Sequence, residues 1–276
     1  MNQTFSLSRF GRLLYKYFSD NRGQLLTSLA MLTGILLTVS TLIYLGVPFL
    51  VDQKRVAFLF VIGWFAWFVF TWMQVEVLNH RERSINYLLQ PASQLEKFLL
   101  IWVISGVGFL TVYLLLFTVV DAVGVGYVNS RNWTPEQLST IRQVDGVLRI
   151  TPFYKSEQLL PPAHILVLTG LLHPVCLATF LFVKRYSLPI VSVVIVIVLV
   201  TGFFINFYTV KAMLSPAHVV SVLPLESPTV KLPASSVYRT IDLPQPLGDI
   251  IRYATGITGI VLLYVIAFFR LKEREV

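Results

Sequence analysis

Long apolar runs alternate with short polar segments along the whole chain. Charge-free apolar runs identify six spans, and each reaches roughly the 20 residues that an α-helix needs to cross a bilayer. The spans cover about residues 25–50, 56–75, 98–120, 162–183, 186–210 and 250–270, with residues 253–269 as the charge-free part of the last one. This pattern predicts an all-α integral membrane protein with six transmembrane helices.

The chain of residues 1–276 is interpreted as a single membrane domain with no soluble catalytic domain. Its first apolar run begins only near Leu25, and no small-residue cleavage site follows, which is not typical of a secretory signal peptide. We therefore expect the first span to be retained. Six crossings would place both termini on the same side of the membrane.

The first 24 residues combine apolar and basic side chains. Arg9, Arg12 and Lys16 are interleaved with the apolar residues Phe5, Leu7, Phe10, Leu13, Leu14 and Phe18. A helix with this pattern lies in the membrane interface. We expect residues 1–24 to form an amphipathic interfacial segment, with a frayed basic tail as the alternative.

The segment between the second and third spans carries the most specific pattern. Residues 76–90 are typical of a helix that leaves the bilayer, and Pro91 disfavours helical geometry at Gln90, so the chain should break there. Ser93 and Glu96 have the spacing of a capping box, which predicts a new helix running into the third span. The pattern indicates a bent helix-loop-helix element facing the cytoplasm, although a generic loop could contain the same cap.

Two kinds of side chain gather in the first part of this element. A polar group comes first and consists of His80, Arg81, Glu82 and Arg83. An apolar patch follows and consists of Ile85, Leu88 and Leu89. An apolar patch beside cations suits docking into the groove of a partner protein.

A longer polar segment, residues 121–161, follows the third span. Thr134, with Pro135 at the first helical position and Gln137 three residues after the cap, predicts a short helix that ends near Gln143. This segment would face the extracytoplasmic side.

A second long segment, residues 211–249, precedes the last span. Short β-prone pieces, such as residues 218–223 and 236–243, are separated by prolines. We expect the two long segments to form a small extracytoplasmic cap rather than a domain.

Short loops that are rich in Lys and Arg stay in the cytoplasm, so the positions of these residues indicate how the chain is oriented in the membrane. With both termini in the cytoplasm, the inner segments carry 12 of the 22 basic residues. These are Arg9, Arg12, Lys16, Arg22, Arg81, Arg83, Lys97, Lys184, Arg185, Arg270, Lys272 and Arg274. The others lie mostly in the two long segments, where charge has less influence. We expect a multi-pass protein of the inner (cytoplasmic) membrane with both termini inside.

The composition agrees with a membrane protein. Apolar residues make up 55% of the chain and charged residues only 13%, whereas a soluble domain has about 25% charged residues. The net charge of +8 comes from basic residues spread beside the apolar runs, so it indicates topology rather than nucleic-acid binding. The single cysteine, Cys176, lies inside an apolar run, where a small buried side chain is the expected interpretation.

Motifs for common chemistries are missing from the sequence. It contains no GxxxxGK[ST] phosphate loop, no HExxH, no GxSxG and no paired cysteines. We therefore expect no ATP hydrolysis by this chain, no catalytic or metal-binding residues and no cofactor. The charge-free spans also argue against a proton- or ion-coupled carrier, which needs ionisable groups at membrane depth.

His173 and Pro174 form an ionisable feature in the middle of the fourth span. Proline removes a backbone hydrogen bond and kinks the helix, while the histidine can face a packed interior or a cavity. A structural kink with a hydrogen-bonded histidine is the favoured interpretation. A place on a substrate path is the alternative.

The run Leu88-Leu89-Gln90-Pro91-Ala92-Ser93-Gln94-Leu95-Glu96-Lys97-Phe98-Leu99 resembles the loop between the second and third spans of type-2 ABC exporter permeases. The N-terminal segment is similar to the elbow helix of that family, and residues 269–275 are similar to its short basic C-terminus. The resemblance implies a permease that forms a homodimer or heterodimer and docks on a separate cytoplasmic ATPase. It implies a coupling role for Arg81, Arg83, Leu88, Leu89, Pro91, Ser93 and Glu96.

Two functions remain open from the sequence. One is a transport subunit that moves an unknown substrate, in which ATP-driven closure of the partner pushes on the coupling element and shifts the spans between two packings. The other is a membrane anchor or assembly factor that binds a partner through its extracytoplasmic loops.

Overall fold

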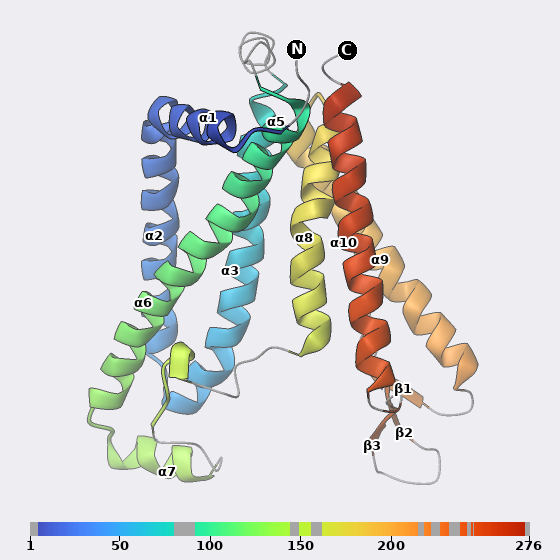
Figure 1. Cartoon of the computed structure of the whole chain (residues 1–276). Coiled ribbons are helices and arrows are strands. Elements are labelled where there is room, and N and C mark those ends of the chain that lie inside the picture. Colours follow the sequence, from blue (N-terminus) through green and yellow to red (C-terminus); the bar gives the residue numbers. More distant parts are fainter. Residues whose placement is uncertain are drawn as a thin grey trace. The chain divides into compact units, whose positions relative to one another are not determined.

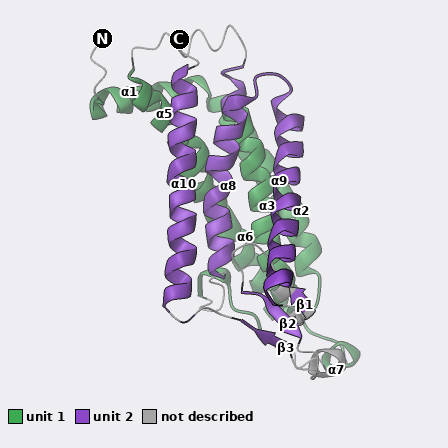
Figure 2. Cartoon of the chain, turned by 90° about the vertical axis from the view of Figure 1, so that its right-hand side faces the viewer, with its two compact units in different colours: residues 1–74, 86–160 green, residues 75–85, 161–276 purple. Residues whose placement is uncertain are grey.

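The computed structural model divides the chain into two compact units (Figure 2). Unit 1 comprises residues 1–74 and 86–160, and unit 2 comprises residues 75–85 and 161–276. The structure describes residues 5–79, 92–143, 149–155, 162–214, 218–221, 227–231, 238–241, 244 and 246–273. The apolar pattern predicts one membrane domain, and it contains no sign of this division.

Within the described residues, six helices are long and apolar enough to cross a membrane. Their membrane-compatible parts are Arg22–Tyr44, Leu50–Glu76, Gln94–Ser130, Ala163–Phe182, Ser187–Met213 and Leu247–Glu273. Each contains most of one predicted apolar run. The prediction of a helical chain with six membrane-compatible helices is therefore confirmed.

Unit 1 contains the first three of these helices and several shorter elements (Figure 1). They are α1 (Leu7–Asp20), α2 (Arg22–Tyr44), α3 (Pro48–Glu76), α5 (Gln94–Ile101), the π-helix η1 (Trp102–Gly108), α6 (Phe109–Ser130), α7 (Pro135–Gln143) and the 3₁₀-helix η2 (Phe153–Lys155). The last two residues of α3 are grouped with unit 2.

The helix α1 lies crosswise to α2 at the start of unit 1 (Figure 1). The corner between them is Asn21, whose side-chain amide donates to the Tyr17 carbonyl at 3.0 Å. The Asn21 carbonyl accepts the amide of Leu25 at 3.0 Å and so begins α2. One residue thus ends the first helix and starts the second, as polar residues near helix ends commonly do.

The second helical span begins earlier than its charge-free run. The pattern predicts spans at residues 25–50 and 56–75, but α2 ends at Tyr44 and α3 begins at Pro48. Proline is favoured in the first turn of a helix because its missing amide needs no partner there. Within the first turns of α3, Arg55 pairs with Asp52 at 2.7 Å, a spacing that supports a helix.

The third membrane helix is much longer than the bilayer requires. α5, η1 and α6 form one continuous helix, Gln94–Ser130, of 37 residues. At 1.5 Å per residue this is about 55 Å, compared with a hydrocarbon core of about 30 Å. The pattern predicts a helix that begins at Gln94, a span at 98–120 and a loop from residue 121, so the start of the helix is confirmed and its end lies beyond the predicted span. In the π-helical part, the Ser105 carbonyl accepts a hydrogen bond from Trp67 Nε1 of α3 at 2.6 Å.

Unit 2 is built on α8 (Ala163–Phe182), α9 (Ser187–Met213) and α10 (Leu247–Glu273). α8 and α10 approach each other closely where glycines remove side-chain bulk. A Cβ added to Gly256 would lie 2.4 Å from Val167 Cγ1, and one added to Gly170 would lie 3.0 Å from Ile260 Cδ1. Small residues at a helix crossing are typical of packing within membranes.

A small antiparallel sheet precedes α10. Its order is β1 (His218–Ser221), β2 (Thr229–Lys231), β3 (Tyr238–Thr240). The predicted β-prone pieces at 218–223 and 236–243 are confirmed by β1 and β3, and the sheet is an exception to the all-α prediction. The strand β2 lies between the two predicted pieces and pairs with both β1 and β3.

Candidate functional site

The Glu96 carboxylate is the centre of the candidate site. Its side chain has no exposed surface and lies in the first turn of α5. Glu96 Oε2 accepts the Ser93 amide at 2.8 Å, and Ser93 Oγ accepts the Glu96 amide at 3.2 Å. This reciprocal pair confirms the predicted capping box and explains why α5 begins at Gln94.

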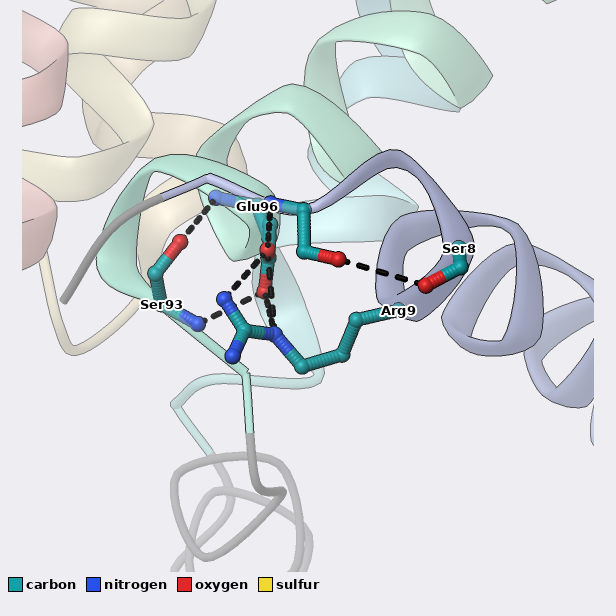
Figure 3. Close-up of polar contacts among 5 residues, drawn as sticks. Ser8, Arg9, Ser93 and Glu96 are labelled. Atoms are coloured by element: carbon teal, nitrogen blue, oxygen red, sulfur yellow. Dashed lines mark hydrogen bonds and ion pairs between the residues drawn. The ribbon is translucent and has the colours of Figure 1, made fainter. Parts of the chain in front are cut away.

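The same carboxylate also binds the start of α1 (Figure 3). Glu96 Oε1 accepts the backbone amide of Ser6, the N-cap residue of α1, at 2.7 Å. Arg9 Nη2 donates to Oε1 at 2.7 Å, and Arg9 Nε donates to Oε2 at 2.9 Å. The hydrogen bond with Glu96 raises the pKa of Arg9 above its ordinary value. One carboxylate therefore lies at the start of two helices, where the helix dipoles favour negative charge.

Apolar packing supports this polar junction. Leu13 of α1 is buried against Leu100 and Ile104. Phe10, Leu14, Tyr17, Phe70 and Ala92 are partly buried around this cluster. α1 is thus attached to α5 and η1 by a polar contact at its start and by an apolar contact at its middle.

A further contact joins α1 to α3. The Tyr17 hydroxyl donates a hydrogen bond to the side-chain carbonyl of Gln74. Burial raises the pKa of Tyr17 to about 12, so the phenol stays protonated and remains a donor at neutral pH. The end of α1 is therefore fixed as well as its start.

The outward faces of α1 differ in character. Leu7, Tyr15 and Phe18 are exposed apolar residues, while Arg12 and Lys16 are exposed cations. At 3.6 residues per turn, the three apolar residues share one side of the helix and the two cations share another. Helix formation over the predicted segment is confirmed for Leu7–Asp20. Its interfacial position stays a prediction, and this separation of faces agrees with it.

The other predicted coupling residues are placed as follows. Ser93 and Glu96 meet in the junction described above. Arg81, Arg83, Leu88, Leu89 and Pro91 lie outside the described residues. The helix expected over residues 76–90 does not start as predicted, because α3 ends at Glu76 and residues 77–79 form a turn.

A second polar cluster lies in unit 1 near the end of α2. Asp121 Oδ1 accepts the Tyr44 hydroxyl at 2.6 Å and lies 3.5 Å from Arg55 Nη1. Both charged side chains are almost completely buried. Asp121 Oδ2 accepts the Phe153 amide at 2.6 Å, and Arg55 donates to the Thr151 carbonyl at 2.6 Å. The cluster thus holds residues 151–153 against three helices.

Sequence reasoning missed this second cluster. Arg55 lies directly before the charge-free run at 56–75, and Asp121 lies directly after the run at 98–120, so the pattern places both residues in loops. The available signal was two opposite charges at the ends of consecutive spans, which antiparallel helices bring to the same level. The capped helix in the following segment was found correctly, since Thr134 and Gln137 exchange hydrogen bonds at the start of α7.

His173 and Pro174 both lie within α8 in unit 2. The imidazole is buried, and its Nδ1 lies 2.9 Å from the Tyr264 hydroxyl of α10. This hydrogen bond agrees with the structural interpretation of the histidine. A role on a substrate path stays a prediction.

The described part of the chain holds no group of three or more His, Cys, Asp or Glu residues that could bind a metal ion. Comparison with protein-family models, with curated proteins and with solved structures finds no match for this chain. Its function is therefore inferred from the sequence and the geometry.

Proposed function

We propose that this chain is the membrane-spanning permease subunit of an ATP-binding-cassette transporter, which moves a substrate with energy from a separate cytoplasmic ATPase. The junction at Glu96 carries the proposal. It joins the amphipathic N-terminal helix to the helix that follows the predicted coupling residues. The resemblance of residues 88–99 and of the N-terminal segment to type-2 exporter permeases gives this junction its functional meaning.

A coupling element has to pass displacement to the membrane helices instead of absorbing it in a loose loop. The capping box begins a helix that continues for 37 residues, so movement at Ser93 is passed along one long element. The bonds from Ser6 and Arg9 attach α1 to the same point. A push near Ser93 would therefore move α1 and the third membrane helix together.

In the proposed arrangement, both termini and the Glu96 junction face the cytoplasm, in the inner membrane. The ATPase would dock on the segment that contains Arg81, Arg83, Leu88, Leu89 and Pro91. A second permease, either another copy of this chain or a related one, would complete the transporter. The distribution of basic residues over the short segments supports this orientation.

The second candidate function is a membrane anchor or assembly factor that binds a partner on the extracytoplasmic side. The cluster around Asp121 favours it, because this cluster holds residues 151–153 in a fixed position. A fixed surface loop suits recognition of a partner. The same loop is compatible with a permease, whereas a helix junction at Glu96 has no evident use in an anchor.

Purification of the tagged full-length chain from its native membrane tests the proposal. The expected result is recovery of a protein with a GxxxxGK[ST] phosphate loop in stoichiometric amount. Cross-linking in the membrane before extraction keeps a weak complex intact. Recovery of the intact chain without such an ATPase, or with extracytoplasmic partners instead, would contradict the proposal.

A further inference from the structure

Glu76 forms a contact in unit 2 that is separate from the Glu96 junction. It is the last residue of α3, and its Oε2 accepts the Ser187 hydroxyl at 2.8 Å. The same oxygen accepts the side-chain amide of Asn79 at 2.9 Å. Ser187 is the first residue of α9 and is buried. The contact joins residues 111 positions apart in the sequence.

Electrostatics favour this placement for α9 and not for α3. The C-terminal end of a helix carries partial negative charge, so a carboxylate in the last turn of α3 is unfavourable for that helix. The N-terminal end of α9 carries partial positive charge and favours the same carboxylate. Tyr186, the N-cap residue of α9, lacks the short side-chain oxygen of common caps. Glu76 therefore places a carboxylate at the start of α9, where the N-cap residue Tyr186 makes no side-chain cap hydrogen bond.

The backbone at Tyr186 and the backbone after Glu76 both adopt defined conformations. Tyr186 adopts a left-handed conformation with φ of 51°, which is unfavourable for a residue other than glycine and persists only where the surroundings enforce it. After Glu76, the amides of Leu78 and Asn79 donate to the carbonyls of Val75 and Glu76, both at 2.9 Å. Val75 is fully buried. The end of α3 therefore leads into a tight turn held at α9.

We propose that Glu76 is a positioning residue that attaches the end of α3 to the start of α9 and passes displacement there into α9. This inference rests on the proposed permease function. Glu76 precedes the predicted docking residues in the chain, and Glu96 follows them. Each glutamate lies at the start of another helix, Glu76 at α9 and Glu96 at α1. Nucleotide-driven movement of the partner thus reaches α9 through Glu76 and α1 through Glu96.

The test uses the full-length chain in complex with its ATPase, reconstituted in lipid nanodiscs. A Cys176→Ser background removes the native thiol, and Arg185→Cys places a label site on the exposed residue two positions before Ser187. The readout is the maleimide labelling rate without nucleotide and after trapping with ATP and vanadate. Ser187→Ala and Glu76→Ala remove the contact from its two sides. Ser192→Ala is the matched control, because its hydroxyl donates within α9 to the Leu188 carbonyl.

We expect the labelling rate to change on trapping in the unaltered complex and in Ser192→Ala, and this change to be lost in Ser187→Ala and Glu76→Ala. If Glu76→Ala does not fold, Ser187→Ala decides the outcome, because the serine substitution removes only a hydroxyl. A wild-type change in rate in Ser187→Ala would overturn the inference and leave the permease function intact. Absence of any ATPase bound to the unaltered chain would overturn both.

Discussion

Arg9 and Glu96, which are 87 residues apart in the sequence, form an ion pair at 2.7 Å between the starts of α1 and α5. The Glu96 carboxylate accepts hydrogen bonds from two nitrogens of the Arg9 guanidinium, and the Glu96 side chain has no exposed surface. Such two-point pairs fix orientation as well as distance. We therefore expect this pair to determine the position of α1 on the third membrane helix.

Replacing Arg9 should loosen α1. In Arg9→Gln the fixed two-point pair is lost, so a spin label at the exposed position Tyr15 should become more mobile. Arg12→Gln is the control, because Arg12 is exposed on the same helix and its replacement removes the same charge. Equal mobility of the label in Arg9→Gln and in the unaltered protein would show that the pair of Arg9 with Glu96 does not determine the position of α1.

Removing the cap at Ser93 should weaken the first turn of α5. Ser93→Ala should cost about 1 kcal/mol of local helix stability, because the Glu96 amide loses its acceptor. Hydrogen exchange should therefore become faster at the first amides of α5. Thr134→Ala removes the corresponding cap of α7 and should affect only that helix. Unchanged exchange at Glu96 would mean that the cap contributes no stability.

Two neighbouring glycines of α6 should respond differently to alanine. A Cβ added to Gly124 would lie 2.5 Å from the Tyr44 ring, whereas one added to Gly126 meets nothing within 4 Å. Gly124→Ala should displace Tyr44 from Asp121 and cost about 1–3 kcal/mol of stability. Its apparent unfolding temperature in detergent should fall, while that of Gly126→Ala should not. Equal unfolding temperatures would contradict the packing of Tyr44 described here.

The exposed faces of α1 predict its place in the membrane interface. Spin labels at Leu7 and Phe18 should be relaxed by oxygen, which concentrates in lipid, because both positions lie on the apolar side. Labels at Arg12 and Lys16 should be relaxed by a water-soluble nickel reagent. Relaxation by the nickel reagent at all four positions would place α1 in water.

Local features of this fold were predictable from the sequence, and long-range ones were not. The caps at Ser93 and Thr134 could be predicted because their partners lie three residues away. The pair of Arg9 with Glu96 could not, since it depends on how α1 folds back on the third membrane helix. The pattern places Arg55 and Asp121 in loops because a charged residue normally marks the end of a span, whereas the two residues lie in α3 and α6. In the structure each charge compensates the other within extended helices.

ATP hydrolysis tests the central claim most directly. The purified chain alone should not hydrolyse ATP, because it lacks a phosphate-binding loop. The complex recovered from native membranes should hydrolyse ATP, and Glu96→Ala should reduce the stoichiometry or activity of the bound ATPase, while Thr134→Ala should leave both unchanged. An intact, correctly inserted chain that binds no ATPase, or a complex unaffected by Glu96→Ala, would contradict this account.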